Sequence, residues 1–119
     1  MTNTNITVSH LFELLRDAVS RAQPSVLKAS DDDLARDLFE EFDVGAISFL
    51  HESSLTRLRA ADLVDDNAVG LCTQLRAHWL TLQSRDWSLP EVRSAPEWRA
   101  FFTLAAEVAR ALDGAAATT

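Results

Sequence analysis

The sequence predicts an all-α, single-domain bundle of about five helices, and three observations support this. Apolar residues recur three and four positions apart along most of the chain, which is the spacing of one helix face. Three glycines and three prolines in 119 residues are too few for the many turns of an all-β chain. This length suits one domain with one modest core. We therefore expect residues 1–119 to form a single helical domain, with loose tails at 1–6 and 114–119.

The first expected helix runs from Val8 to Ala22. Its apolar stripe consists of Val8, Leu11, Phe12, Leu15, Val19 and Ala22. Pro24 ends this helix, because the residue before a proline is disfavoured in helical conformation.

Ser30 and the three aspartates after it predict the start of a second helix. A serine at the N-cap satisfies a free amide, and carboxylates favour the positive end of the helix dipole. The stripe of this helix is Leu34, Leu38, Phe39 and Phe42, and we expect Gly45 to stop the helix or to bend its path.

Residues 46–62 are expected to form a third helix, with a break near residue 53 as the alternative because Ser53 and Ser54 favour a new helix start. Asp65 or Asp66 then caps a fourth helix. Its stripe is Ala68, Leu71, Leu75, Trp79 and Leu82, and Gly70 is expected to mark a close contact between helices.

The stretch "SLPEVRSAPEWR", residues 88–99, contains two similar units, Ser88-x-x-Glu91 and Ser94-x-x-Glu97. Each has the spacing of a capping box, with a proline in the first turn. We interpret them as two successive helix starts rather than as a tandem recognition motif. The second start leads into a long helix from about Ala95 to Leu112, which Gly114 ends.

Charge limits the classes of partner. The formal net charge is −7, and Lys28 is the only lysine. A chain of this charge repels phosphates and anionic lipids, which predicts no nucleic-acid or membrane partner and favours a basic protein partner. The single cysteine, Cys72, fits a reducing compartment, and there is no apolar run long enough to span a membrane. We therefore expect a cytoplasmic protein.

Few residues have the spacing that catalysis or metal binding requires. His10 has Glu13 three positions on, but His51 and His78 supply no further ligand on that face. Nucleophile motifs and a glycine-rich phosphate loop are absent from the sequence, and Cys72 is expected to be a small buried residue. The sequence thus predicts a protein without metal, cofactor or enzymatic activity.

The most conspicuous charged feature is an acidic run from residue 31 to residue 43, in which Arg36 is the only base. Its members are Asp31, Asp32, Asp33, Asp37, Glu40, Glu41 and Asp43. One interpretation is a solvated helix face, and the other is a surface that docks onto a basic partner. Asp65 and Asp66 could extend such a surface.

The three tryptophans differ in their expected roles. Trp79 and Trp98 fall on apolar stripes and are predicted to be core residues. Trp87 lies between two helices, just before the Ser88 cap. There it can pack against Val92 as a hydrophobic staple, or it can be an exposed interface anchor, since tryptophan is enriched at binding hot spots.

The segments "ISFLHESSL" (47–55) and "WSLPEVRSAPEWR" (87–99), in a small acidic helical chain, resemble the bacterial immunity-type proteins that neutralise a cognate toxin. The resemblance implies stoichiometric inhibition, in which a helical scaffold presents carboxylates to a cationic active site. We therefore predict a non-enzymatic protein-binding module with the acidic run and Trp87 in its interface. The alternative is a helical regulator or assembly subunit that self-associates, as a homodimer, through Trp98, Phe101 and Phe102.

Overall fold

The computed structural model describes residues 7–117, and every regular element in this span is helical. The elements are α1 (Val8–Ser20), η1 (Pro24–Lys28), α2 (Asp31–Ala35), η2 (Arg36–Phe42), α3 (Asp43–Ser48), α4 (Glu52–Ala60), α5 (Asp66–Leu82), α6 (Leu89–Ser94) and α7 (Pro96–Ala117). The all-α, single-domain prediction is confirmed. The expected tail at residues 1–6 lies outside the described residues, as do residues 118 and 119.

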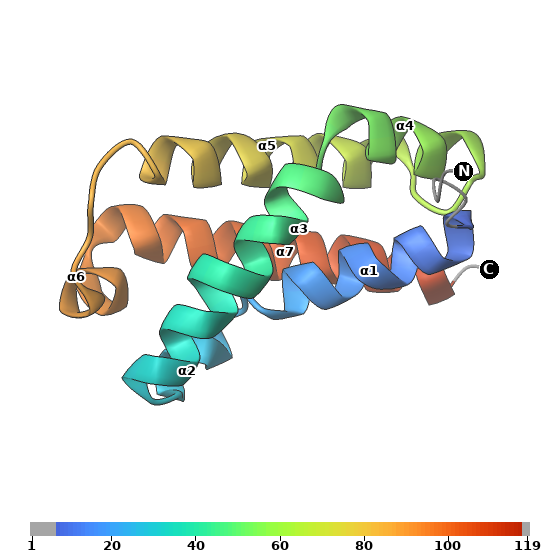
Figure 1. Cartoon of the computed structure of the whole chain (residues 1–119). Helices are drawn as coiled ribbons and strands as arrows, with labels where there is room; N and C mark the ends of the chain where they lie inside the picture. The colour runs from blue at the N-terminus through green and yellow to red at the C-terminus, as the bar shows by residue number, and fades with distance from the viewer. Residues whose placement is uncertain (1–6, 118–119) are drawn as a thin grey trace, which may run out of the picture.

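The long helices α5 and α7 lie side by side and run in opposite directions, joined by the short α6 at one end (Figure 1). Helix α1 packs along α7. The segments α2, η2 and α3 follow one another without a break, and this rod of residues 31–48 crosses the other helices diagonally. α4 then covers the far end of α5.

Helix α1 begins as expected and ends slightly early. The Thr7 hydroxyl accepts a hydrogen bond from the His10 amide at 3.1 Å and caps the first turn. The buried face matches the predicted stripe, except that Ala18 joins it and Val8 is only half-buried. The helix ends at Ser20, and Pro24 starts the short 3₁₀ helix η1 rather than ending α1 directly.

The rod begins at the predicted cap, where the Asp33 amide donates to the Ser30 hydroxyl at 3.2 Å. Its buried residues recur every four positions through its length and just beyond it: Leu34, Leu38, Phe42, Ala46 and Leu50. In a regular α-helix each four-residue step turns about 40° past a full circle, so this line would drift around the helix. The middle segment η2 is π-helical, and its wider turns hold more residues and offset that drift.

Gly45 neither stops nor bends this helix, so that prediction was wrong. It is a buried residue inside α3, where a β-carbon would overlap the Ala18 side chain of α1. The glycine therefore allows the rod and α1 to approach closely. We had expected Gly70 to have this role, but a β-carbon at Gly70 would have no atom within 4 Å apart from its own helix and chain neighbours.

The helix expected over residues 46–62 is interrupted, so the alternative of a break is correct. Helix α3 ends at Ser48, and α4 begins at Glu52 with His51 as its N-cap; the His51 Nδ1 atom accepts from the Ser53 amide at 3.1 Å. Helix α4 ends in a Schellman motif, in which the Leu63 amide donates to the Leu58 carbonyl at 3.1 Å. Asp62 occupies the left-handed position of this motif, with φ of 60°.

Of the two caps considered for α5, Asp65 is the one used, and its carboxylate accepts from the Ala68 amide at 2.8 Å. The buried face of α5 contains the predicted apolar stripe, with one residue replaced by its neighbour. Cys72 is buried where Leu71 was expected, and Leu71 is only half-buried.

Only the first of the two predicted capping boxes forms. The Glu91 amide donates to the Ser88 hydroxyl at 3.3 Å, and the Ser88 amide donates to the Glu91 carboxylate at 2.9 Å. Ser94 instead ends α6, and its hydroxyl donates to the Pro90 carbonyl at 2.8 Å. The extended residue before α7 is Ala95. Helix α7 also continues past Gly114 to Ala117, contrary to the prediction that it ends there.

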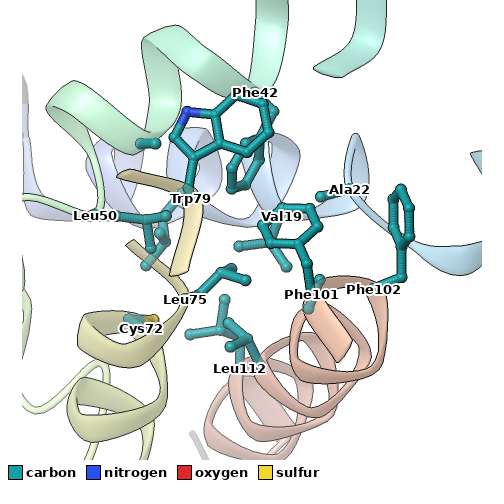
Figure 2. Close-up of a cluster of buried hydrophobic side chains, with 14 of the residues drawn as sticks. Val19, Ala22, Phe42, Leu50, Cys72, Leu75, Trp79, Phe101, Phe102 and Leu112 are labelled. Atoms are coloured by element: carbon teal, nitrogen blue, oxygen red, sulfur yellow. The ribbon is translucent and has the colours of Figure 1, made fainter. Parts of the chain in front are cut away.

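Side chains from α1, the rod, α5 and α7 meet in one apolar core (Figure 2). At its centre Phe42, Trp79 and Phe101 contact one another, with Phe42 and Trp79 ring centroids 4.9 Å apart in an edge-to-face arrangement. Trp79 and Trp98 are fully buried, as predicted. Among the residues whose burial the structure describes, no polar or charged residue is fully buried, so charge is confined to the surface.

Candidate functional site

The acidic run lies on the rod, on the sides turned away from the buried line of Leu34, Leu38 and Phe42. The seven carboxylates nevertheless have different surroundings. Four of them make described hydrogen bonds within the chain, and the other three are exposed.

Asp31 and Asp37 connect the rod to other elements. Arg93 of α6 donates to the Asp31 carboxylate at 2.9 Å and also to the carbonyls of Leu27 and Ala29. Arg21, just after α1, donates to the Asp37 carboxylate at 3.1 Å, and this hydrogen bond is the main reason why the pKa of Arg21 is raised. These two ion pairs link the rod to α6 and to the end of α1.

Asp33 has a local partner. The guanidinium of Arg36, one helical turn further on, donates to its carboxylate at 2.6 Å. Both side chains are about half exposed, so the pair contributes little to stability and leaves Asp33 accessible from solvent.

Asp43 was expected in the interface, and the structure places it elsewhere. Its carboxylate accepts a hydrogen bond from the indole nitrogen of buried Trp79 at 2.9 Å. A buried indole N–H needs an acceptor. Asp43 thus supports the core, and we exclude it from the candidate surface.

Asp32, Glu40 and Glu41 are exposed side chains. Glu41 acts on Arg21 and Glu40 acts on Arg36 through charge alone, which helps to raise the pKa of each arginine. We define the acidic face as Asp31, Asp32, Asp33, Asp37, Glu40 and Glu41. Six carboxylates there share three arginine partners, Arg21, Arg36 and Arg93, so the face keeps an excess of negative charge.

Trp87 lies in the connection between α5 and α6 and is half-buried. Its indole nitrogen donates to the Leu82 carbonyl at 2.8 Å, and its ring meets Trp98 edge to face at 6.0 Å. The Arg85 guanidinium stacks over the Trp87 ring, 3.7 Å from the ring centroid. These contacts attach Trp87 to α5 and α7, and none of its described contacts is to a carboxylate of the acidic run.

A groove between α4 and α5 is a feature that the sequence interpretation missed. It has a volume of about 790 Å³. Its lining residues are Leu50, Glu52, Leu55, Thr56, Arg59, Ala60, Val69, Thr73, Arg76, Ala77 and Leu80. A second stripe on α5, formed by Val69, Thr73, Ala77 and Leu80 at helical spacing, was the available signal. A smaller cavity of about 450 Å³ lies between α1 and α7, where Arg16 pairs with Asp113 at 2.7 Å.

The histidines are far apart and have unrelated surroundings. His10 is 3.6 Å from Glu13, His51 caps α4, and the His78 ring contacts Phe101 edge to face. Within residues 7–117 no three His, Cys, Asp or Glu side chains come together as a metal site would require. Cys72 is buried, as expected, and burial raises the pKa of its thiol to about 12.

Within the described part of the chain, no helix is both long enough and apolar enough to cross a lipid bilayer. The chain matches no protein-family model, no characterised protein and no solved structure at a significant level.

Proposed function

We propose that this chain is a non-enzymatic protein-binding module that docks its acidic face onto a basic surface of another protein. The supporting observation is the exposure of Asp32, Glu40 and Glu41 on a rod that packs into the core through Leu34, Leu38 and Phe42. The helical backbone that carries these carboxylates is already ordered before a cationic partner binds, and complementary charge raises both association rate and specificity.

An inhibitor of the immunity type is the form of this function that we favour. The resemblance of residues 47–55 and 87–99 to immunity-type proteins supports it, together with the net charge of −7. An inhibitor of this kind occupies a cationic active site, such as that of a nuclease, in place of its phosphate substrate. The expected product is a one-to-one complex in which the partner has no activity.

The self-associating alternative needs a different surface from the one that we expected. Trp98 and Phe101 are fully buried in the single chain, and Phe102 is 3% exposed. These aromatics form the core and cannot reach a second copy while the chain stays folded.

A triple variant tests the proposal: Asp32→Asn, Glu40→Gln and Glu41→Gln. Its matched control is Glu13→Gln, Glu97→Gln and Glu107→Gln, which removes the same charge from exposed positions on α1 and α7. Each tagged protein is used to capture partners from the source cells, together with the products of neighbouring genes. The affinity of each purified partner is then measured between low and high salt.

The wild type and the control are expected to bind a basic partner with affinity that falls steeply with salt. Removing three charges from the face should weaken binding at least tenfold and flatten the salt dependence. A tenfold loss corresponds to about 1.4 kcal/mol of binding free energy, which three lost charge contacts together can supply. The proposal is wrong if every recovered partner binds the triple variant with the wild-type affinity and salt dependence.

A further inference from the structure

The groove between α4 and α5 has an apolar wall where a surface helix would ordinarily be polar. Helix α5 buries one face in the core, and its second stripe of Val69, Thr73, Ala77 and Leu80 lines the groove. Leu80 is 45% exposed at the groove edge. Helix α4 packs beside this stripe without covering it fully, and a partly apolar groove between two helices is a surface on which an amphipathic helix can dock.

An exposed apolar ridge lies on the nearby helix α3. Val44 and Ile47 are 57% and 56% exposed, and with Leu80 they are the large apolar side chains that remain exposed among the residues whose burial is described. Glu40 precedes Val44 by four positions and Ile47 follows by three, so the three share one side of the rod. This ridge has the spacing of a helix that docks into an apolar groove.

The ridge and the groove are neighbours in the fold. Arg76, which lines the groove, donates from its Nε atom to the Ala46 carbonyl of α3 at 3.0 Å. Leu50, two residues beyond α3, is also part of the groove lining. Because the two surfaces are adjacent, a two-fold axis near this crossing brings each ridge to the groove of a second copy.

The charges of the two surfaces are complementary. Glu40 and Glu41 flank the ridge. The groove lining has one acidic residue, Glu52, and two arginines. Asp62 and Asp66 pair with Arg59, whereas the described hydrogen bond of Arg76 is to a carbonyl and not to a carboxylate. A two-fold dimer makes this contact twice. In each contact, Glu40 and Glu41 beside the ridge of one copy approach Arg76 in the groove of the other copy. Because each copy has a net charge of −7, two copies repel each other in orientations that do not bring acidic residues to arginines.

From this arrangement we infer that the chain forms a two-fold homodimer in which the Val44–Ile47 ridge of each copy occupies the α4–α5 groove of the other. The inference does not depend on the proposed basic partner, although Glu40 and Glu41 belong to both surfaces. Dimerisation would cover part of the acidic face, so a basic partner and a second copy would compete for it.

Sedimentation velocity on the purified chain tests the dimer, from about 1 μM to about 100 μM. The salt is held near 0.15 M, where the Debye length of about 8 Å screens the net repulsion but not contact pairs. The average mass should rise towards twice the chain mass. Ile47→Asp and Leu80→Asp should each weaken association at least tenfold, while Ala100→Asp, at an exposed position on α7, leaves it unchanged. Circular dichroism melts confirm that each variant is folded.

A disulfide trap locates the contact. A copy with Ile47→Cys is mixed with a copy carrying Leu80→Cys under a glutathione redox buffer, and the mixed dimer should crosslink far more than a pairing with Ala100→Cys. Cys72 is buried, so it should not form disulfides in this assay. The inference is overturned by a monomer at all concentrations, by association that Ile47→Asp and Leu80→Asp do not affect, or by crosslinking no greater than the Ala100→Cys control.

Discussion

Asp43 shows that a carboxylate in an acidic run can belong to the core. Its partner, the indole nitrogen of Trp79, is 36 positions away in the sequence. Asp31, Asp33 and Asp37 likewise bind arginines, whereas Asp32, Glu40 and Glu41 are exposed. The sequence interpretation treated the seven residues alike because their composition and spacing do not reveal these partners.

Replacing Asp43 with alanine should destabilise the fold by about 1–3 kcal/mol, because it leaves a buried indole N–H without an acceptor. Asp43→Asn keeps a carbonyl oxygen at this place and should cost less. Chemical denaturation of both variants measures the two free energies of unfolding. Glu40→Ala, at an exposed position inside the rod, is the control and should stay within about 0.5 kcal/mol of the wild type. Equal losses for Glu40→Ala and Asp43→Ala would contradict the assignment.

Cys72 should not react with thiol reagents while the chain is folded, because burial raises its pKa to about 12. The unfolded thiol ionises near pH 8.5, so the stability that this group contributes is complete below that pH and is lost as the pH rises towards 12. Mass spectrometry after alkylation, with and without denaturant, checks the first expectation. Rapid labelling of the folded chain at neutral pH would show that the thiol is accessible.

At the scale of the elements, most helix starts could be predicted from the sequence because a cap acts within one turn. Ser30, Asp65 and Ser88 are used as caps. The second capping box, at Ser94, failed because α6 continues through that residue. The roles of Gly45 and Gly70 were not predictable, since they depend on which helix lies opposite.

Gly45 and Gly70 form a matched pair for mutation to alanine. Gly45→Ala should destabilise the fold by about 1–3 kcal/mol, because the new β-carbon would overlap Ala18 and force α1 and the rod apart. Gly70→Ala enters open space inside α5 and should stabilise the fold by up to about 1 kcal/mol through helix propensity. Thermal or urea unfolding gives both values. If Gly45→Ala were neutral, the close approach of the two helices would be in doubt.

The Ser88–Glu91 capping box predicts a dependence of stability on pH. The Ser88 backbone amide, followed by its hydroxyl, lowers the pKa of Glu91. Ionised Glu91 therefore favours folding above the ordinary pKa of about 4.3, and this contribution is lost as the pH falls through the lower folded-state value. Glu91→Gln should be less stable than the wild type at pH 7, with a gap that closes in acid. Urea unfolding curves that stay equally separated at all pH values would contradict this.

At the scale of the whole molecule, apolar side chains fill the core and charge remains outside, so the surface carries the candidate functions. The acidic face is carried by α2 and η2 and the groove by α4 and α5, and α3 follows η2 and precedes α4 along the chain (Figure 1). Glu40 and Glu41 belong to the acidic face and adjoin the α3 ridge, so the proposed basic partner and the proposed second copy would compete for them.

Neutralising Asp32, Glu40 and Glu41 together should not destabilise the monomer, because none of the three makes a described hydrogen bond. At low salt the variant should be slightly more stable than the wild type, since it has less repulsion among like charges, and the difference should vanish at about 1 M salt. Thermal melts across this range measure the effect. A large loss of stability would show that these carboxylates have a structural role and would weaken the proposed function.

The sequence alone determined the helical class, most helix starts and the acidic exterior, because periodicity, caps and composition act within a few residues of the chain. Only the tertiary structure decided which carboxylates are exposed, which glycine lies in a helix contact and where a groove opens. Those features depend on partners distant in sequence, such as Asp31 with Arg93, or on how helices cross. The buried residues from Leu34 to Leu50 depend on both levels. Their four-residue spacing can be read from the sequence, but only the structure shows the π-helical segment that keeps them on the inward side of the rod.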